Sequence, residues 1–449
     1  MTVFVFVLIA LAVLTLLVFV HRWLWIRLFR DTTRPGSPVR RAGTVAAFLL
    51  PVLALAALTA GRAGAPFWLQ RTVAWPGFMW LAVLLYLTLA MLVAEVVRRV
   101  WLRRPARTPL AAGAGRGSAP HEPEPLVREE AGPGDSGRGD SGHAGDAGAA
   151  GAGPGDLATA AAPVAQGGPG EGPEGVTRRL FVARTLGGAA LVATAATVGT
   201  GTYGVLRGPR VKRVQVPLAR LPRAAHGFRI AVVSDVHLGP VLGRAHAQRI
   251  VDTVNRTQPD LIAIVGDLVD GDVQDLGPAA EPLRRLTSRH GTFFVTGNHE
   301  YFSGAQQWVD HVRELGLTPL ENARRELPYF DLAGVNDVAG ETEGHGPDFQ
   351  AALGDRDRSR TSVLLAHQPI VIDDAVRHGV DLQLSGHTHG GQLWPGKYLA
   401  ELANPTVAGL ERYGDTQLYV SRGAGAWGPP VRVGAPSDIT VVELASYQA

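Results

Sequence analysis

The stretch FRIAVVSDVHLG, residues 228–239, joins a short apolar run to two metal-capable side chains. Its apolar residues run from Ile230 to Val233, and Asp235 and His237 follow within four positions. A short apolar run rich in β-branched residues favours a buried strand over a helix. Strands that end in polar side chains are typical of open α/β sheets, whose ligands gather beyond the carboxyl ends of the strands.

Four later stretches repeat this pattern. DLIAIVGDLVD (260–270) ends in Asp267 and Asp270, GTFFVTGNHE (291–300) in Asn298, His299 and Glu300, TSVLLAHQP (361–369) in His367, and VDLQLSGHTHGG (380–391) in His387 and His389. Helical periodicity separates the early stretches, at residues 244–256 and 279–290. The alternation of strand, polar cluster and helix predicts an α/β domain over residues 211–449.

The side chains in these clusters indicate metal chemistry. They are carboxylates, imidazoles and one amide, and the chain has no cysteine, so they suit divalent or trivalent ions of intermediate hardness. They are too many for one tetrahedral zinc and sufficient for two ions, with Asp267 able to bridge the pair. If the strand geometry continues beyond residue 385, His387 and His389 point to the same side and each can serve one ion.

Taken in order, the five blocks resemble the calcineurin-like metallophosphoesterase family. The resemblance covers residues 211–444, and GNHEYFSG (297–304) and GHTHGGQLWPG (386–396) are most similar to its bacterial membrane-associated or exported members. It implies a β-sandwich flanked by helices, and two metal ions drawn from Mn, Fe or Zn. It also implies a ligand set in which Asp235, His237 and His389 hold one ion, Asn298, His367 and His387 hold the other, and Asp267 is shared.

The same resemblance assigns two catalytic roles. His299 matches the histidine that donates a proton to the leaving group, and Asp270 matches the position that supports this histidine by a hydrogen bond. Purple acid phosphatases carry a tyrosine at the position of Asp270, so no tyrosinate–iron colour is expected. Glu300 and Tyr301 adjoin the site and are candidates for contact with substrate. Gln392 and Trp394 follow the last ligands and either line the mouth of the site or pack within their loop. LAGVND (332–337) is expected to be another core strand and turn, and Asn336 and Asp337 are candidates for a rim contact. Four other histidines lie away from strand ends and are not expected to be ligands: His246, His290, His311 and His378.

The N-terminal part of the chain, residues 1–104, reads as a membrane region. Its apolar stretches at 3–20, 42–60 and 78–97 are each long enough to cross about 30 Å of hydrocarbon as a helix. Residues 1–107 contain 13 arginines and two acidic residues, so the remainder of the chain carries a net charge of −8 against +3 overall. The basic pI therefore belongs to the membrane region, and no nucleic-acid partner is expected.

Arginines are also distributed unevenly between the loops of this region. The loop after the first stretch carries Arg22, Arg27, Arg30, Arg34, Arg40 and Arg41, and the third stretch is followed by Arg98, Arg99, Arg103, Arg104 and Arg107. The loop after the second stretch has only Arg62 and Arg71. The positive-inside rule then places the N-terminus outside and residues after the third span in the cytoplasm.

Two further segments precede the α/β domain. Residues 105–176 are rich in Gly, Ala, Pro, Asp and Glu and are predicted to be a disordered linker. Residues 177–206 resemble a twin-arginine export signal, with Arg178, Arg179 and Phe181 before an uncharged run, or else form an ordinary fourth span. Both interpretations carry the chain outward, and the first adds the twin-arginine export machinery as a partner.

These observations predict a multi-pass membrane protein whose catalytic domain hydrolyses phosphate esters outside the cytoplasm. The expected reaction is attack by a metal-activated hydroxide on a phosphodiester or phosphomonoester. Esters of lipids or of cell-envelope polymers are among the candidate substrates. Two alternatives stay open. One is a non-catalytic, metal-stabilised membrane scaffold or sensor. The other is a domain that faces the cytoplasm and cleaves a nucleotide-linked lipid or nucleic acid.

Overall fold

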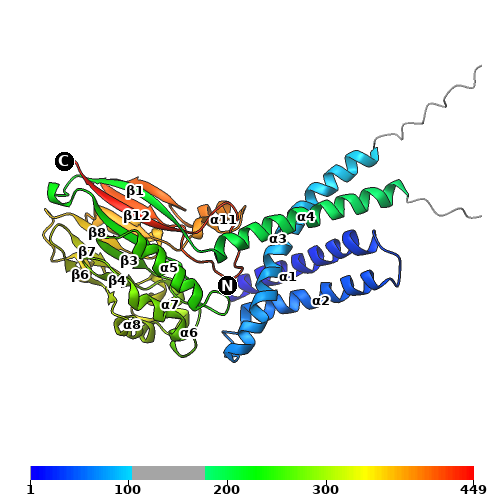
Figure 1. Cartoon of the computed structure of the whole chain (residues 1–449), viewed down its shortest axis with the longest axis horizontal. Helices are drawn as coiled ribbons and strands as arrows, with labels where there is room; N and C mark the ends of the chain where they lie inside the picture. Colours follow the sequence, from blue (N-terminus) through cyan, green and yellow to red (C-terminus); the bar gives the residue numbers. More distant parts are fainter. Residues whose placement is uncertain (1, 104–176, 449) are drawn as a thin grey trace, which may run out of the picture. The chain divides into compact units, whose positions relative to one another are not determined.

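The computed structural model describes residues 2–103 and 177–448, which form one compact unit (Figure 1). The predicted linker, 105–176, lies outside the described residues. Four long helices precede the α/β domain: α1 (Thr2–Trp25, continued by a π-helical turn over Ile26–Arg30), α2 (Pro38–Thr59), α3 (Phe67–Arg103) and α4 (Arg178–Leu206). All four are long and apolar enough to cross a membrane.

The helices begin and end where local chemistry allows it. Ser37 caps α2 by accepting a hydrogen bond from the backbone N–H of Arg40, and Pro38 occupies the first helical position, where its missing N–H costs nothing. Helix α3 extends beyond the predicted apolar stretch at both ends, because Gln70 and Arg71 before it and Arg98 and Arg99 after it continue the helix as polar turns. Hydropathy marks the apolar part of such a helix and not its ends.

Two six-stranded sheets form the α/β domain. The first sheet contains, in spatial order, β1 (Arg210–Leu218), β12 (Asp438–Ser446), β2 (Phe228–Val233), β3 (Leu261–Val265), β4 (Thr292–Val295) and β5 (Thr318–Pro319). Strands β2 to β5 are parallel to one another, and β12 is antiparallel to β2 and parallel to β1.

The second sheet has a parallel centre and antiparallel edges. It contains, in spatial order, β10 (Gly409–Tyr413), β11 (Thr416–Val420), β9 (Leu382–Ser385), β8 (Ser362–Leu365), β7 (Asp331–Gly334) and β6 (Ala323–Glu326). The hairpins β10–β11 and β6–β7 close its two sides. Parallel β8 and β9 therefore end at the same edge.

Helices cover the outer faces of both sheets. The helices of this domain are α5 (Arg244–Arg256), α6 (Val273–Ala280), α7 (Asn298–Ser303), α8 (Ala305–Glu314), α9 (Phe349–Leu353), α10 (Ile372–Arg377) and α11 (Gly396–Ala403). Short 3-10 turns connect several of them, at Arg223–Ala225, Glu281–Arg285, Val338–Glu343, Pro369–Val371 and His389–Gly391. Residues of α5, α6 and α8 share one buried cluster with the outer face of the first sheet, and residues of α9 and α10 share another with the second.

The central core lies between the two sheets. In β2, Ile230 and Val232 point into it, whereas Ala231 and Val233 point to the helices, as the two-residue period of a strand requires. Both faces of such a strand are buried, which explains why its sequence is continuously apolar and not alternating. The predicted α/β sandwich flanked by helices and preceded by apolar helices is confirmed.

Candidate metal centre

The polar residues after the strands lie in tight turns at the carboxyl ends of β2, β3, β4, β8 and β9. Left-handed backbone angles, with φ between 49° and 73°, occur at Asp235, His237, Asp267, His387 and His389. Each such residue costs about 1–3 kcal/mol when it is not glycine, and strain of this kind concentrates at functional sites. The fold holds the turns in place by backbone hydrogen bonds, among them Asp235 N–H to Gly266 O and His237 N–H to Asp267 O.

The geometry expected for His387 and His389 is wrong, although both reach the site. Strand β9 ends at Ser385, and the two histidines follow in a turn that is closed by the 3-10 segment His389–Gly391. Their left-handed φ angles, and not the alternation of a strand, aim the two rings at different groups of ligands. A glycine is required at 386, since a methyl there would overlap the Ser234 hydroxyl and the Asp235 carboxylate.

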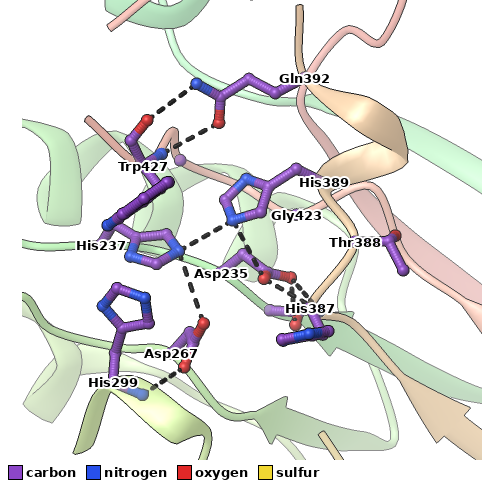
Figure 2. A network of polar contacts seen from close by, with 12 residues as sticks. Asp235, His237, Asp267, His299, His387, Thr388, His389, Gln392, Gly423 and Trp427 are labelled. Carbon is purple, nitrogen blue, oxygen red and sulfur yellow. Dashed lines mark hydrogen bonds and ion pairs between the residues drawn. The ribbon is translucent and has the colours of Figure 1, made fainter. Parts of the chain in front are cut away.

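One group of ligand atoms comes from the turns after β2 and β9 (Figure 2). The Nε2 atoms of His237 and His389 are 2.9 Å apart, and Oδ1 of Asp235 lies 3.3 Å from Nε2 of His389. All three residues are buried. Ser234 donates a hydrogen bond of 2.6 Å to Oδ2 of Asp235, which orients the carboxylate.

A second group lies beside the first. Oδ2 of Asp267 is 3.1 Å from Nε2 of His367, and Nδ1 of His387 is 3.0 Å from Oδ1 of Asn298. The same Oδ2 of Asp267 is 3.7 Å from Nε2 of His237 in the first group. Asp267 therefore lies between the two groups, where one carboxylate oxygen can serve both.

The hydrogen bonds around these residues fit a pair of cations. His237 and His367 use their Nδ1 atoms for Asp270 and for the carbonyl oxygen of Val265, so each ring directs its Nε2 atom toward the site. Within the described part of the chain, Nε2 of His367 has no hydrogen-bond partner. Buried acceptors that face one another at 2.9–3.3 Å repel unless a proton or a cation lies between them. A sulfur-free set of this size is the donor chemistry of Mn, Fe or Zn.

Comparison with known proteins identifies the family of this chain. Residues 228–391 match the family model described as calcineurin-like phosphoesterase. An uncharacterized metallophosphoesterase of Aquifex aeolicus is 34% identical over 240 residues, which cover 52% of this chain and 91% of that protein. A second, from Bacillus subtilis, is 30% identical and matches 60% of this chain and 98% of that protein. The chain belongs to the calcineurin-like metallophosphoesterase family.

Relatives with membrane segments are also found. A Danio rerio protein named as a transmembrane protein with a metallophosphoesterase domain is 38% identical over 269 residues, covering 57% of this chain and 62% of that protein. The chain thus spans less than two thirds of the length of this relative. Among solved structures, a dimetal phosphatase from Danio rerio is similar with a TM-score of 0.35 and 12% identity, over 49% of this chain and 93% of that one. A likeness this distant carries nothing about the reaction.

In this metallophosphoesterase, His299 lies beside both groups of ligands and forms a third group of candidate ligand atoms with His237 and Asp270. It follows β4 at the start of α7, and its Nδ1 is 2.7 Å from Oδ1 of Asp270. Its backbone N–H donates to Oδ1 of Asp267 at 2.9 Å. Asp270 thus accepts from both His237 and His299, which places a metal-facing imidazole and a free imidazole on one carboxylate.

Electrostatics keep these groups in usable protonation states. Burial raises the pKa of Asp270, but His237 and His299 outweigh it and lower that pKa to about 2, so the carboxylate is ionised at neutral pH. Burial and the neighbouring His367 lower the pKa of His387 to about 4, so this ring stays neutral and keeps a lone pair for a cation.

Of the four candidates for contact with substrate or the mouth of the site, three are engaged in other interactions. Glu300 is fully buried and accepts hydrogen bonds from the backbone N–H groups of Asp267, Leu268 and Gly297, so it shapes the turns that carry the ligands. The Tyr301 hydroxyl points to the carbonyl oxygen of His345. Gln392 bonds both the N–H and the C=O of Trp427, as the loop-packing alternative expects, whereas the side chain of Trp394 is 51% exposed and stays a candidate for the mouth of the site.

The core strand and turn expected at 332–337 is confirmed by the buried strand β7 and the loop after it, and the two candidate rim residues, Asn336 and Asp337, are engaged in loop structure. The Asn336 amide donates to the carbonyl oxygen of His345. Asp337 is buried and accepts from the Gln368 amide and the backbone N–H of Ala339. They hold the loop after β7 in place.

Sequence reasoning missed Arg432. Its buried guanidinium donates to the carbonyl oxygens of His389 and Gly425, and its Nη2 lies 3.0 Å from Nδ1 of His389. No motif surrounds it, because it acts from a loop 43 residues further along the chain. Trp427 and Phe302 were also missed, and their rings lie edge-on to His299 at centroid distances of 5.9 and 5.6 Å.

Proposed function

We propose that this protein is a membrane-anchored, binuclear metal-dependent phosphoesterase. The position of Asp267 supports this most directly, since one carboxylate oxygen lies 3.7 Å from His237 and 3.1 Å from His367, in two separate ligand groups. Two-metal phosphoesterase sites place their ions about 3.5–4 Å apart and share a bridging ligand. Asp235, His237 and His389 would hold one ion, and Asn298, His367 and His387 the other.

A bound cation pair supplies hydroxide at neutral pH and neutralises the non-bridging oxygens of the phosphate. The chain's own residues do the remaining work. Asp270 accepts a hydrogen bond from Nδ1–H of His299, so the opposite nitrogen, Nε2, is directed away from Asp270. When Nε2 also carries a proton, it can donate that proton to the departing oxygen. The edge-on rings of Phe302 and Trp427 restrict the orientation of His299 and shield it from water.

We propose that the protein is located in the cell membrane, with its catalytic domain outside the cytoplasm. If all four helices cross the membrane in alternation, the turn between α2 and α3 lies on the same side as the end of α4. This turn is poor in arginine, so the positive-inside rule places that side outside the cytoplasm. The substrates are then phosphate esters met at the outer face, and Arg178 and Arg179 are compatible with the twin-arginine export machinery.

Metal analysis and hydrolysis of model esters test the proposal together. The full-length protein, purified in detergent, is expected to bind two equivalents of Mn, Fe or Zn and to cleave bis(p-nitrophenyl) phosphate or p-nitrophenyl phosphate. Asp267→Asn should lose at least one ion and nearly all turnover, because the amide removes the negative charge that both ions share. His345→Ala, at an exposed histidine away from the ligands, is the matched control.

A single bound ion in the wild type, unaffected by Asp267→Asn, would refute the binuclear site. Full metal loading without hydrolysis of either ester, with any of the three metals, would favour the scaffold or sensor instead.

A further inference from the structure

The active site opens into a cavity that the membrane helices help to form. The cavity has a volume of 290 Å³ and lies within the one compact unit that contains both the helices and the catalytic domain. From the catalytic domain it is lined by His299, Phe302 and Trp427, among others. Its opposite wall is the end of α2, the turn at 60–66 and the start of α3, including Arg62, Phe67 and Phe78.

Close packing holds this wall against the catalytic domain. Phe67 packs on the buried cluster beneath the first sheet, and a methyl at Gly428 would lie 3.8 Å from the Phe78 ring. Helix α4 is equally close: the Gly201 carbonyl oxygen accepts a hydrogen bond from the backbone N–H of Arg432 at 3.4 Å. Only residues 207–209 separate α4 from β1, so the domain has no tether that would carry it away from the helices.

The cavity lies at the boundary between the apolar and polar parts of the helices. The apolar stretch of α2 ends at residue 60 and that of α3 begins at residue 78, and Leu58 and Phe78 both line the cavity. Arg62 and Gln70, which also line it, are on the polar side of this boundary. For helices that span a bilayer, this is the level of the lipid headgroups.

Its lining suits an amphiphilic phosphate. Phe302 is 65% exposed and Trp427 48% exposed, although both contact the ring of His299, so apolar surface is presented directly at the catalytic group. Arg62 is exposed and has no ion-pair partner within residues 2–103 and 177–448, and a guanidinium is well shaped to bind a phosphate oxygen pair. Asp272 and Asp275 line the same cavity and favour a headgroup that brings hydrogen-bond donors over one that brings a second anion.

We propose that the substrate is a phosphate ester carried by a membrane lipid, which enters between the α2–α3 wall and the loop bearing Trp427. Its apolar chain would lie against Phe78 and Leu58, and its phosphate would reach His299 past Arg62. This rests on the proposed phosphoesterase function and adds the class of substrate to it.

Alkyl phosphates of increasing length test the proposal on the full-length protein in lipid nanodiscs. Methyl, butyl and octyl phosphate are compared as inhibitors of bis(p-nitrophenyl) phosphate hydrolysis, below micelle-forming concentrations. Inhibition should strengthen by about fourfold for each methylene that reaches the apolar wall, so octyl phosphate should act at a concentration roughly 100-fold or more below that of methyl phosphate.

Matched variants separate the wall from simple partitioning into the nanodisc. Phe78→Ser should reduce the octyl-to-methyl ratio by about tenfold, because its ring is the apolar contact, whereas Val93→Ser, on a 66% exposed position of the same helix away from the cavity, should leave it unchanged. Arg62→Gln should weaken inhibition by both methyl and octyl phosphate about tenfold and leave the ratio between them unchanged. Arg71→Gln, the control, should change neither the strength of inhibition nor the ratio.

Equal inhibition by all three alkyl phosphates, or equal effects of Phe78→Ser and Val93→Ser, would overturn the lipid substrate in favour of a soluble ester and leave the phosphoesterase proposal intact. Absence of hydrolysis by the metal-loaded wild type would instead remove the phosphoesterase function, and the lipid substrate with it.

Discussion

At the scale of single residues, His299 is the side chain whose role can be separated from metal binding. Its Nδ1 is taken by Asp270, and its ring faces the cavity between two aromatic side chains. His299→Ala should keep both metals and lose about 10²–10⁴ in turnover of an ester with a poor leaving group, since only that group needs a proton. Hydrolysis of p-nitrophenyl and alkyl esters by the same preparation measures the difference.

His345→Ala should leave both rates unchanged, because this side chain is exposed away from the ligands. An equal loss for good and poor leaving groups in His299→Ala would remove the proton-donor role.

His246 provides a test of stability against pH. Burial, together with the nearby Arg249 and Arg432, lowers its pKa from 6.5 to about 3, and within the described residues neither ring nitrogen has a hydrogen-bond partner. The unfolded chain takes up this proton first as the pH falls below 6.5, so stability is complete above that value and is lost toward pH 3. At about pH 5 the loss from this residue is roughly 2 kcal/mol.

His246→Leu should therefore flatten the decline of the unfolding free energy between about pH 7 and pH 5 by that amount. The measurement is denaturant unfolding of wild type and variant across this pH range in the presence of a chelator. All other titrating groups are the same in the two proteins, so their contributions cancel in the difference. Parallel pH profiles for wild type and variant would show that His246 is not buried as a neutral ring.

At the scale of elements, the turns after the strands carry the site, and their glycines are the most exacting positions. Gly386, between β9 and His387, has the Ser234 hydroxyl and the Asp235 carboxylate where a Cβ would be. Gly386→Ala must displace Asp235 from the first ligand group. We expect a loss of about 1–3 kcal/mol in stability and at least one bound metal, measured by thermal unfolding and elemental analysis.

Gly188→Ala in α4 is the control, since no atom lies within 4 Å of the added methyl. A Gly386→Ala protein with full metal content and wild-type stability would contradict the close approach of the β2 and β9 turns.

At the scale of the whole molecule, the prediction concerns which side of the membrane the domain occupies. The chain has no cysteine, so labelling of a single introduced cysteine shows the accessibility of that position alone, and no native cysteine has to be removed first. Asp415→Cys, at a fully exposed side chain in the β10–β11 turn, should react with a membrane-impermeant maleimide on intact, wall-stripped cells. Arg34→Cys, in the arginine-rich loop between α1 and α2, should react only after lysis.

The reverse pattern would place the catalytic domain in the cytoplasm and favour the nucleotide-lipid or nucleic-acid alternative. Labelling of both positions in intact cells would contradict the alternating passage of the four helices.

The strands, the polar residues that follow them and the apolar helices could be predicted from the sequence, because each depends on residues that are close together in the chain. Buried strands such as residues 261–265 are continuous apolar runs, and the polar residues that follow them lie at strand ends whatever the rest of the chain does. Apolar stretches between arginine clusters predict membrane helices for the same reason. The order of the five blocks was enough to predict the family, and the α/β sandwich was predicted with it.

The sequence by itself determined which residue types stand at the ends of which strands, and hence the class of chemistry and the family. Only the tertiary structure decided how those residues meet: that left-handed turns and not strand alternation aim His387 and His389, that Arg432 binds His389 from a distant loop, and that Glu300 holds backbone and not substrate. It also decided that Arg62, from the turn between α2 and α3, and Phe78, from α3, line the same cavity as His299. Periodicity and composition describe neighbours along the chain, whereas these contacts depend on which surfaces pack together, and burial of apolar area specifies that only once all elements are present.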